Sequence, residues 1–209
     1  MKIRKLLVPV AVLVCACSFS AMAKGPGGGQ GGPGGGQGGP GPAAVLSADE
    51  ADTLLWMREE EKLAHDVYES LDMKWHLVVL ERIAVSEQRH FDAIGDKIER
   101  YALTDPALPG LGAFSDPDLQ ALYESLLASG LESSVQALVV GATIEDLDIS
   151  DLLLAIEETD EPDLQRTYGY LLEGSKNHLR AFVSRLRALG LDYEPQYIDP
   201  LLFDAIVGV

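Results

Sequence analysis

The chain has 209 residues, a formal net charge of −17 and two cysteines, Cys15 and Cys17. So acidic a protein is poorly suited to bind nucleic acid or an anionic membrane surface, and its charge by itself indicates solubility. Both cysteines lie in a segment that we expect to be removed, which excludes disulfides, thiolate metal sites and cysteine nucleophiles from the mature chain.

Residues 1–23 are typical of a secretory signal peptide. A basic start precedes an apolar run from Leu6 to Val14 and an A-x-A cleavage site at residues 21–23, and the run is too short to span a membrane. A lipoprotein interpretation would need Cys17 in a lipobox, which the preceding residues fit poorly. Loss of the three basic residues in this segment takes the formal charge from −17 to −20. We therefore expect a periplasmic or secreted protein that has no membrane attachment after cleavage.

Residues 24–46 are rich in glycine and proline, and they contain the heptapeptide GPGGGQG twice. Because residues 25–42 have no side chains that could form a core, we predict a disordered tether with an r.m.s. length of roughly 24 Å. The tether is either a plain linker or a low-specificity attachment to cell-surface material. It disfavours assembly into a closed shell, and a homo-oligomer is left open.

A folded domain is predicted over residues 47–190. It begins with a capping box formed by Ser47 and Glu50, and the first helix is expected to run to about Leu71. Apolar residues spaced alternately by three and four mark the buried seam of this helix, and Glu61 interrupts the seam. A carboxylate that points into a helical core costs free energy unless it is paired.

The second helix, expected over residues 77–101, has the same kind of seam, which Glu87 interrupts. His90 follows three residues later on the same face, and Glu-x-x-His is the spacing with which one helix offers an oxygen and an imidazole nitrogen to one metal ion. A short connection at residues 72–74 makes the two helices antiparallel neighbours. Glu61 lies about twelve residues before this connection and Glu87 about thirteen after it, so we expect both carboxylates at one depth, roughly 20 Å from the turn.

A crossover is predicted next, with a loop over residues 104–114 and a short amphipathic helix over residues 118–129. The third long helix is expected over residues 132–158, and Glu145 is the one acid in its seam. The acids that fall off the seams are predicted to be solvated; they are Glu59, Glu60, Asp146, Asp148, Glu157 and Glu158.

The fourth long helix is expected to begin at residues 159–162, since proline suits a first turn, and to end at Gly190. Its seam contains Ser175 and His178. These residues lie about as far after the second hairpin turn as Glu145 lies before it, so the second hairpin repeats the geometry of the first. Residues 191–209 are expected to form an apolar tail that packs on the bundle.

The predicted fold class is therefore all-α, an antiparallel four-helix bundle with a long crossover between its second and third long helices. Its seams bring five candidate metal ligands to one level: Glu61, Glu87, His90, Glu145 and His178. The seams hold no Arg or Lys near this level, so three unpaired carboxylates indicate a bound cation. Taken singly, either histidine could instead be an ordinary core residue.

Three further side chains have open interpretations. Tyr68 lies in the seam of the first helix, where it is plain core, a hydrogen-bond partner of a ligand or a redox-active catalytic residue. His65 is read as a surface residue or an outer contact of the site in preference to a ligand. His76 is expected to begin the second helix and to be unrelated to the site.

The spacing of Glu61 and Tyr68, followed by Ser86-Glu87-Gln88-Arg89-His90, resembles the first two helices of the ferritin-like superfamily, including bacterioferritins and rubrerythrins. Residues 59–68, 140–145 and 174–179 resemble a bacterial ferritin-like family known mainly as a domain of unknown function. The resemblance covers about residues 47–189. It implies a bundle that holds two metal ions, commonly iron, which react with oxygen or peroxide, with Glu61 and Glu145 as the single-Glu ligands.

The chain departs from the ferritin-like pattern at its second Glu-x-x-His, because Ser175 stands three residues before His178. The site then offers three carboxylates against the four positive charges of two divalent ions, so an unequal pair or a single ion is left open. The metal is expected to be iron, with manganese or another divalent metal as alternatives. We expect either an iron-oxidising or oxygen- or peroxide-reducing protein, with Glu87 and Glu145 bridging, or a non-enzymatic metal-binding or sensing module, or a structural bundle with a decayed site.

Overall fold

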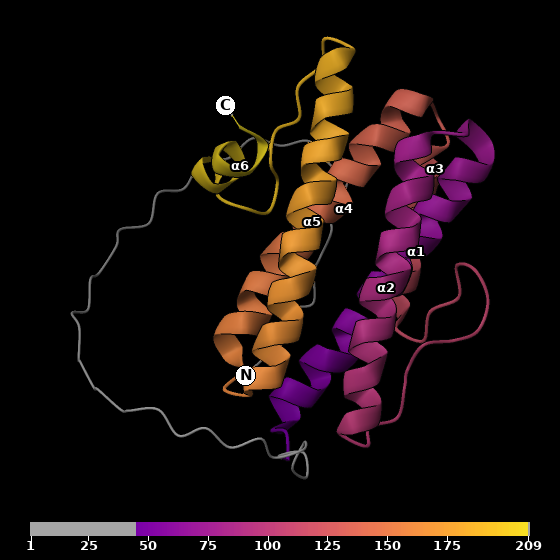
Figure 1. The fold of residues 1–209 in the computed structure, drawn as a ribbon. Coiled ribbons are helices and arrows are strands. Elements are labelled where there is room, and N and C mark those ends of the chain that lie inside the picture. Colours follow the sequence, from indigo (N-terminus) through magenta and orange to yellow (C-terminus); the bar gives the residue numbers. More distant parts are fainter. Residues whose placement is uncertain (1–44, 209) are drawn as a thin grey trace.

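The structure is a computed structural model that describes residues 45–208, and within that range it contains six helices and no strands (Figure 1). The helices are α1 (Ala48–Trp75), α2 (Val78–Arg100), α3 (Pro117–Gly130), α4 (Ser134–Glu158), α5 (Pro162–Ala188) and α6 (Pro200–Val207). The all-α prediction is therefore confirmed. The predicted signal peptide and nearly all of the predicted tether lie outside the described residues. No helix between residues 45 and 208 combines the length and the hydropathy that a membrane span requires.

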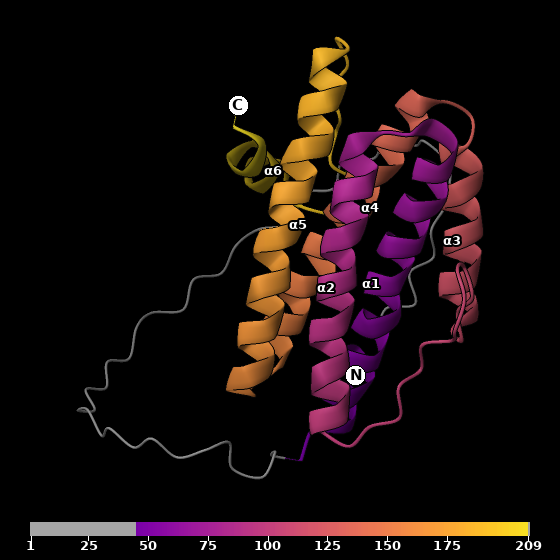
Figure 2. The same cartoon turned by 45° about the vertical axis from the view of Figure 1, so that its right-hand side comes forward.

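The four long helices α1, α2, α4 and α5 lie alongside one another (Figures 1 and 2). Most of the helix–helix contacts occur within two hairpins, α1 with α2 and α4 with α5, and fewer contacts join one hairpin to the other. The short helix α3 packs against α1 and α4, and α6 packs against α5. The side chains between the two hairpins form the hydrophobic core, so polar groups that lie there are buried by both hairpins.

The predicted helix starts agree with the structure, but the end of the first helix is wrong. The Ser47–Glu50 capping box is present, whereas α1 continues through residues 72–74, where a connection was expected. His76 ends α1 with left-handed backbone angles (φ 51°) and donates its N–H to the carbonyl of Asp72, so it does not begin α2. The true turn, at His76 and Leu77, therefore lies later in the chain than predicted.

Helix α4 is buried on more faces than its predicted seam alone. The prediction that Asp146 is solvated is therefore wrong. Asp146 is fully buried under residues 193–198. Its carboxylate accepts hydrogen bonds from the hydroxyl of Tyr193 and from the backbone N–H groups of Gln196, Tyr197 and Ile198, at 2.5–3.2 Å. The C-terminal segment is thus fastened to α4 by one acid, and the chain then continues into α6.

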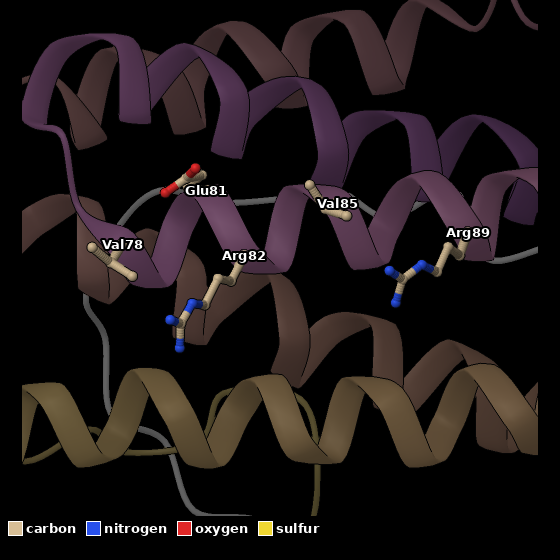
Figure 3. Close-up of a pocket in the computed structure, with 5 residues that line it drawn as sticks. All are labelled: Val78, Glu81, Arg82, Val85 and Arg89. Carbon is tan, nitrogen blue, oxygen red and sulfur yellow. The ribbon is translucent and has the colours of Figure 1, made fainter.

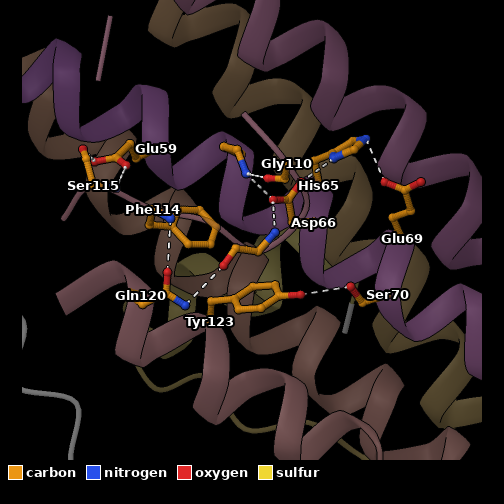
Figure 4. A network of polar contacts seen from close by, with 12 residues as sticks. Glu59, His65, Asp66, Glu69, Ser70, Gly110, Phe114, Ser115, Gln120 and Tyr123 are labelled. Carbon is orange, nitrogen blue, oxygen red and sulfur yellow. Dashed lines mark hydrogen bonds and ion pairs between the residues drawn. The ribbon is translucent and has the colours of Figure 1, made fainter. Parts of the chain in front are cut away.

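The crossover loop covers the outer face of α1, so Glu59 is also buried, contrary to prediction. The Glu59 carboxylate accepts from the N–H and hydroxyl of Ser115 and from the N–H of Asp116, which caps α3 (Figure 4). Two turns further along α1, Asp66 accepts from the N–H of Gly112 at 2.8 Å and pairs with Lys62. These contacts bind the predicted loop and the start of α3 to α1.

Candidate metal centre

Five buried side chains from the four long helices form two groups of potential metal ligands. Glu61, Glu87 and His90 make one group, and Glu87, Glu145 and His178 make the other; within each group the ligand atoms lie within 4.8 Å of one another. All five predicted ligands are therefore brought together. Glu87 belongs to both groups, whereas Glu145, which we expected to bridge as well, belongs to only one.

The two groups have matching internal geometry. Nδ1 of His90 lies 2.8 Å from Oε2 of Glu87 and 3.3 Å from Oε2 of Glu61. Nδ1 of His178 lies 2.7 Å from Oε1 of Glu87 and 3.4 Å from Oε2 of Glu145. Each oxygen of Glu87 thus faces one imidazole, and each imidazole faces one further carboxylate. The histidine rings stack at a centroid distance of 5.5 Å.

The short distances within each group are not accompanied by hydrogen-bond geometry at the two histidines. Although Nδ1 of His90 and Nδ1 of His178 lie within 3 Å of Glu87, neither nitrogen has the alignment of a hydrogen bond with any acceptor. Two ligand atoms that are each about 2.1 Å from one ion, at a right angle, are about 3 Å apart. The observed separations of 2.7–3.4 Å suit neighbouring ligands of one ion, and they also suit pairs of an imidazolium with a carboxylate.

Protons on the two histidines also offset negative charge on the carboxylates in this core. Burial raises the pKa of Glu87, but His178 and His90 outweigh that effect and lower it to about 2. Burial lowers the pKa of His90, but Glu61 and Glu87 outweigh it and raise that pKa to about 11; the pKa of His178 is raised to about 10 by Glu145 and Glu87 against the same effect of burial. Two imidazolium rings can therefore accompany these carboxylates at neutral pH. Metal binding must displace the protons.

The two remaining carboxyl groups, those of Glu61 and Glu145, have pKa values close to neutral pH. Burial raises the pKa of Glu61 to about 7, against the opposing influence of His90. Burial and then the charge of Glu87 raise the pKa of Glu145 to about 7. A divalent cation bound nearby would lower both pKa values, because a positive charge favours the ionised form of a carboxyl group. Both groups would then be ionised at neutral pH.

Tyr68 is fully buried and touches the second group. Its hydroxyl donates to Oε1 of Glu145 at 2.5 Å and lies 3.3 Å from the carbonyl of Gly141. Burial, followed by the charge of Glu145, holds the pKa of Tyr68 well above its usual value, so the hydroxyl keeps its proton. Of the three interpretations left open by the sequence, the structure provides the contact needed for the second, a hydrogen bond that orients a ligand.

Gly174 on α5 makes room for His90. A β-carbon at position 174 would lie 2.4 Å from Nε2 of His90, which is closer than real side chains approach. The edge of Tyr170 packs against the same ring, with centroids 5.6 Å apart. The imidazole is therefore confined between α5 and the two carboxylates that face Nδ1.

The other histidines lie away from the two groups. His65 is half-buried beside Asp66, with Nδ1 2.9 Å from Oδ1, and it belongs to the contacts that anchor the crossover loop (Figure 4). His76 is exposed at the end of α1. A shallow hollow on the outer face of α2 is lined by Val78, Glu81, Arg82, Val85 and Arg89, none of which is a candidate ligand (Figure 3).

Two buried acids close to the candidate centre were missed by the seam pattern. Asp148 follows Glu145 by one helical turn, and its Oδ2 contacts the hydroxyl of Ser175. Glu60 precedes Glu61, and neither of its buried carboxylate oxygens has a hydrogen-bonding donor. Both were predicted to be solvated, and both are at least 94% buried. Asp148 could have been found from its spacing to Glu145, which places the two on one face of α4.

Comparisons with known proteins give a family and a solved relative. The family described as "Uncharacterized protein domain (DUF2202)" matches residues 50–209. The uncharacterized protein MJ0754 of Methanocaldococcus jannaschii is 46% identical over 168 residues, which cover 80% of this chain and 91% of that protein. The crystal structure of the same archaeal protein superposes with a TM-score of 0.79 at 45% identity, over 82% of this chain and 98% of the other.

Proposed function

We propose that this chain, which belongs to the DUF2202 family, is a ferritin-like protein that binds two divalent metal ions, with iron as the expected metal. The observation that carries the proposal is the pair of ligand groups that share Glu87. In the proposal, one ion is bound by Glu61, Glu87 and His90, and the other by Glu87, Glu145 and His178. The four long helices are then a ferritin-like bundle, and α3 with its preceding loop is the crossover.

The proposed activity is oxidation of ferrous iron coupled to reduction of oxygen or peroxide. A pair of adjacent ferrous ions can supply two electrons to one oxidant, which is the chemistry that the metal contributes. The chain contributes a buried site whose carboxylates stabilise the higher charge of the oxidised metal. Tyr68 keeps Glu145 oriented through its hydroxyl, and Gly174 and Tyr170 keep His90 facing the carboxylates. The signal peptide predicted at residues 1–23 makes the proposed location periplasmic or extracellular.

A non-enzymatic metal-binding module is the second candidate, and Ser175 favours it. With a hydroxyl where the ferritin-like pattern has a carboxylate, one ion has a weaker ligand set, so a single retained ion could have a binding or sensing role. The imidazolium pairs also allow a purely structural core, because protons can neutralise the carboxylates without metal. The three possibilities differ in the number of ions bound and in their reaction with oxidant.

An anaerobic ferrous iron titration tests the proposal. The wild-type protein is expected to bind two ions per chain, and Glu87→Ala is expected to lose both, because both groups use this carboxylate. Glu81→Gln is the matched control, since it removes a charge from an exposed position of the same helix. Mixing the loaded protein with oxygen or peroxide should then produce an optical change and repeated turnover.

Each alternative has its own outcome in this experiment. Binding without oxidant consumption would favour the metal-binding module. Failure of the wild-type protein to bind ferrous, manganous or cobaltous ions at about 1 mM, together with a higher melting temperature for Glu61→Ala, would favour the structural core and refute the proposal.

A further inference from the structure

The position that departs from the ferritin-like pattern has an acidic neighbour from another helix. Ser175 lies on α5, three residues before His178, and its hydroxyl contacts Oδ2 of Asp148 on α4. Ser175 is fully buried and Asp148 is 6% exposed. Ser175 and Asp148 therefore form a buried polar pair, and each lies one helical turn from a candidate ligand, His178 on α5 and Glu145 on α4.

One oxygen of Asp148 is held and the other is free to bind a ligand. Oδ2 contacts Ser175, whereas Oδ1 is buried and has no hydrogen-bond partner. The hydroxyl of Ser175 also lies 3.0 Å from the carbonyl of Leu171, one turn earlier on α5, which fixes the direction of the serine side chain. A buried carboxylate oxygen without a donor costs free energy, so its retention calls for an explanation.

The electrostatic surroundings of Asp148 are those of the candidate centre. Burial, then the charges of Glu61 and Glu145, and also that of Glu87, raise its pKa well above the usual value. The contact with Ser175 lowers this pKa, but its effect is smaller than that of burial, and among residues 45–208 no basic side chain forms an ion pair with Asp148. Each of the three predicted carboxylates faces at least one histidine, whereas none of the ion pairs in this part of the chain includes Asp148.

We propose that Asp148, held by Ser175, supplies the fourth carboxylate of the dimetal site in place of the acid missing at position 175. This inference rests on the proposed binding of two ions. Oδ2 would remain in contact with Ser175, and the unpartnered Oδ1 would be the atom available to an ion. Glu61, Glu87, Glu145 and Asp148 then provide four negative charges against the four positive charges of two divalent ions. The site is thereby balanced, although the sequence pattern leaves it one acid short.

The competing explanation is a buried polar pair with no part in metal binding. A protonated Asp148 could donate to Ser175, which would then donate to Leu171, so that both observed contacts are satisfied. Asparagine at position 148 would preserve that arrangement, because its amide can also donate to the serine hydroxyl. It would, however, remove the charge that a metal ligand needs, so Asp148→Asn separates the two explanations.

The test is an anaerobic cobalt(II) titration, followed by visible absorption and by the metal content after gel filtration. The wild-type protein is expected to bind two ions, and Asp148→Asn is expected to bind one, or to bind the second at least about tenfold more weakly. Asp151→Asn is the control, since it removes an acid one turn further along the same helix and is expected to bind two ions. The double variant Asp148→Asn, Ser175→Glu restores a carboxylate from α5 and is expected to recover the second ion.

The outcomes separate this inference from the proposed function. A wild-type protein that binds no cobalt contradicts the proposed function itself. Two ions bound by Asp148→Asn with wild-type affinity overturn the role of Asp148 alone, and a double variant that still binds one ion overturns its equivalence to position 175. Should Asp148→Asn not fold, Ser175→Ala removes only the support of the carboxylate; several-fold weaker binding of the second ion is expected, and unchanged binding refutes the inference.

Discussion

Replacing Gly174 with alanine should disturb His90 through a single added carbon. The new β-carbon would lie 2.4 Å from Nε2 of His90, and ordinary contact begins at 3.4 Å, so the ring would have to move by about 1 Å. It cannot move straight toward the opposite side, because Nδ1 already lies 2.8 Å from Glu87 and 3.3 Å from Glu61. The imidazole must therefore rotate, or α5 must move away from α2.

The size of the effect follows from two opposed contributions. Alanine stabilises a helix interior by about 1 kcal/mol relative to glycine. Forcing an extra carbon into a packed core costs about 1–3 kcal/mol. Gly169 lies on the same helix, and a β-carbon there would meet no atom within 4 Å, so Gly169→Ala should show the first contribution alone. We expect the two variants to differ in free energy of unfolding by about 1–3 kcal/mol, or roughly 2–12 °C in Tm.

Denaturant unfolding of both variants without metal measures this difference, and a cobalt(II) titration then measures the effect on the site. Gly174→Ala should weaken metal binding by about tenfold, because a histidine ligand is misdirected, whereas Gly169→Ala should bind as the wild type does. If the two variants were equally stable and bound metal equally well, the confinement of His90 by α5 would be refuted.

Two further predictions follow from the buried acids and histidines. Burial lowers the pKa values of His90 and His178, but nearby carboxylates outweigh it and raise them to about 11 and about 10. The protonated rings therefore stabilise the metal-free protein fully below pH 6.5, and this contribution is lost as the pH rises toward 10–11. Metal binding requires the deprotonated rings, so the difference in Tm between metal-loaded and metal-free protein should widen from pH 6.5 to 10. Scanning fluorimetry measures this difference, and a constant value would contradict the ion pairs between the histidines and the carboxylates. Asp146→Ala removes four hydrogen bonds to residues 193–198 and should lower the free energy of unfolding by about 3 kcal/mol, with early proteolysis of the C-terminal segment and metal affinity unchanged within about twofold. Equal proteolysis of variant and wild type would show that other contacts hold this segment.

The seam pattern located the ligands because it detects exceptions to a regular apolar stripe. Glu61, Glu87 and Glu145 each break a spacing of three and four, and the structure gathers all three within two small groups. His90 followed from its spacing of three residues after Glu87, and His178 is itself a seam position of the fourth long helix. The fold class and most helix boundaries followed from the same periodicity, together with caps such as Ser47.

The same pattern failed wherever a helix is buried on more than one side. It assumes that residues off the seam meet solvent, but Glu59 meets the crossover loop and Asp146 meets the C-terminal segment. Those contacts join residues that are 47 or more positions apart, so local periodicity contains no trace of them. The turn at His76 was missed for a different reason, because a left-handed histidine replaces the glycine that usually ends a helix.

The division of the fold into two hairpins has a mechanical consequence. Glu61, Glu87 and His90 come from the first hairpin, and Glu145 and His178 come from the second. Ions bound as we propose would therefore cross-link the two hairpins at their interface. Transient separation of the two hairpins would let metal enter and leave. Amide hydrogen exchange at the interface between the hairpins should then be slower in the metal-loaded protein than in the metal-free protein.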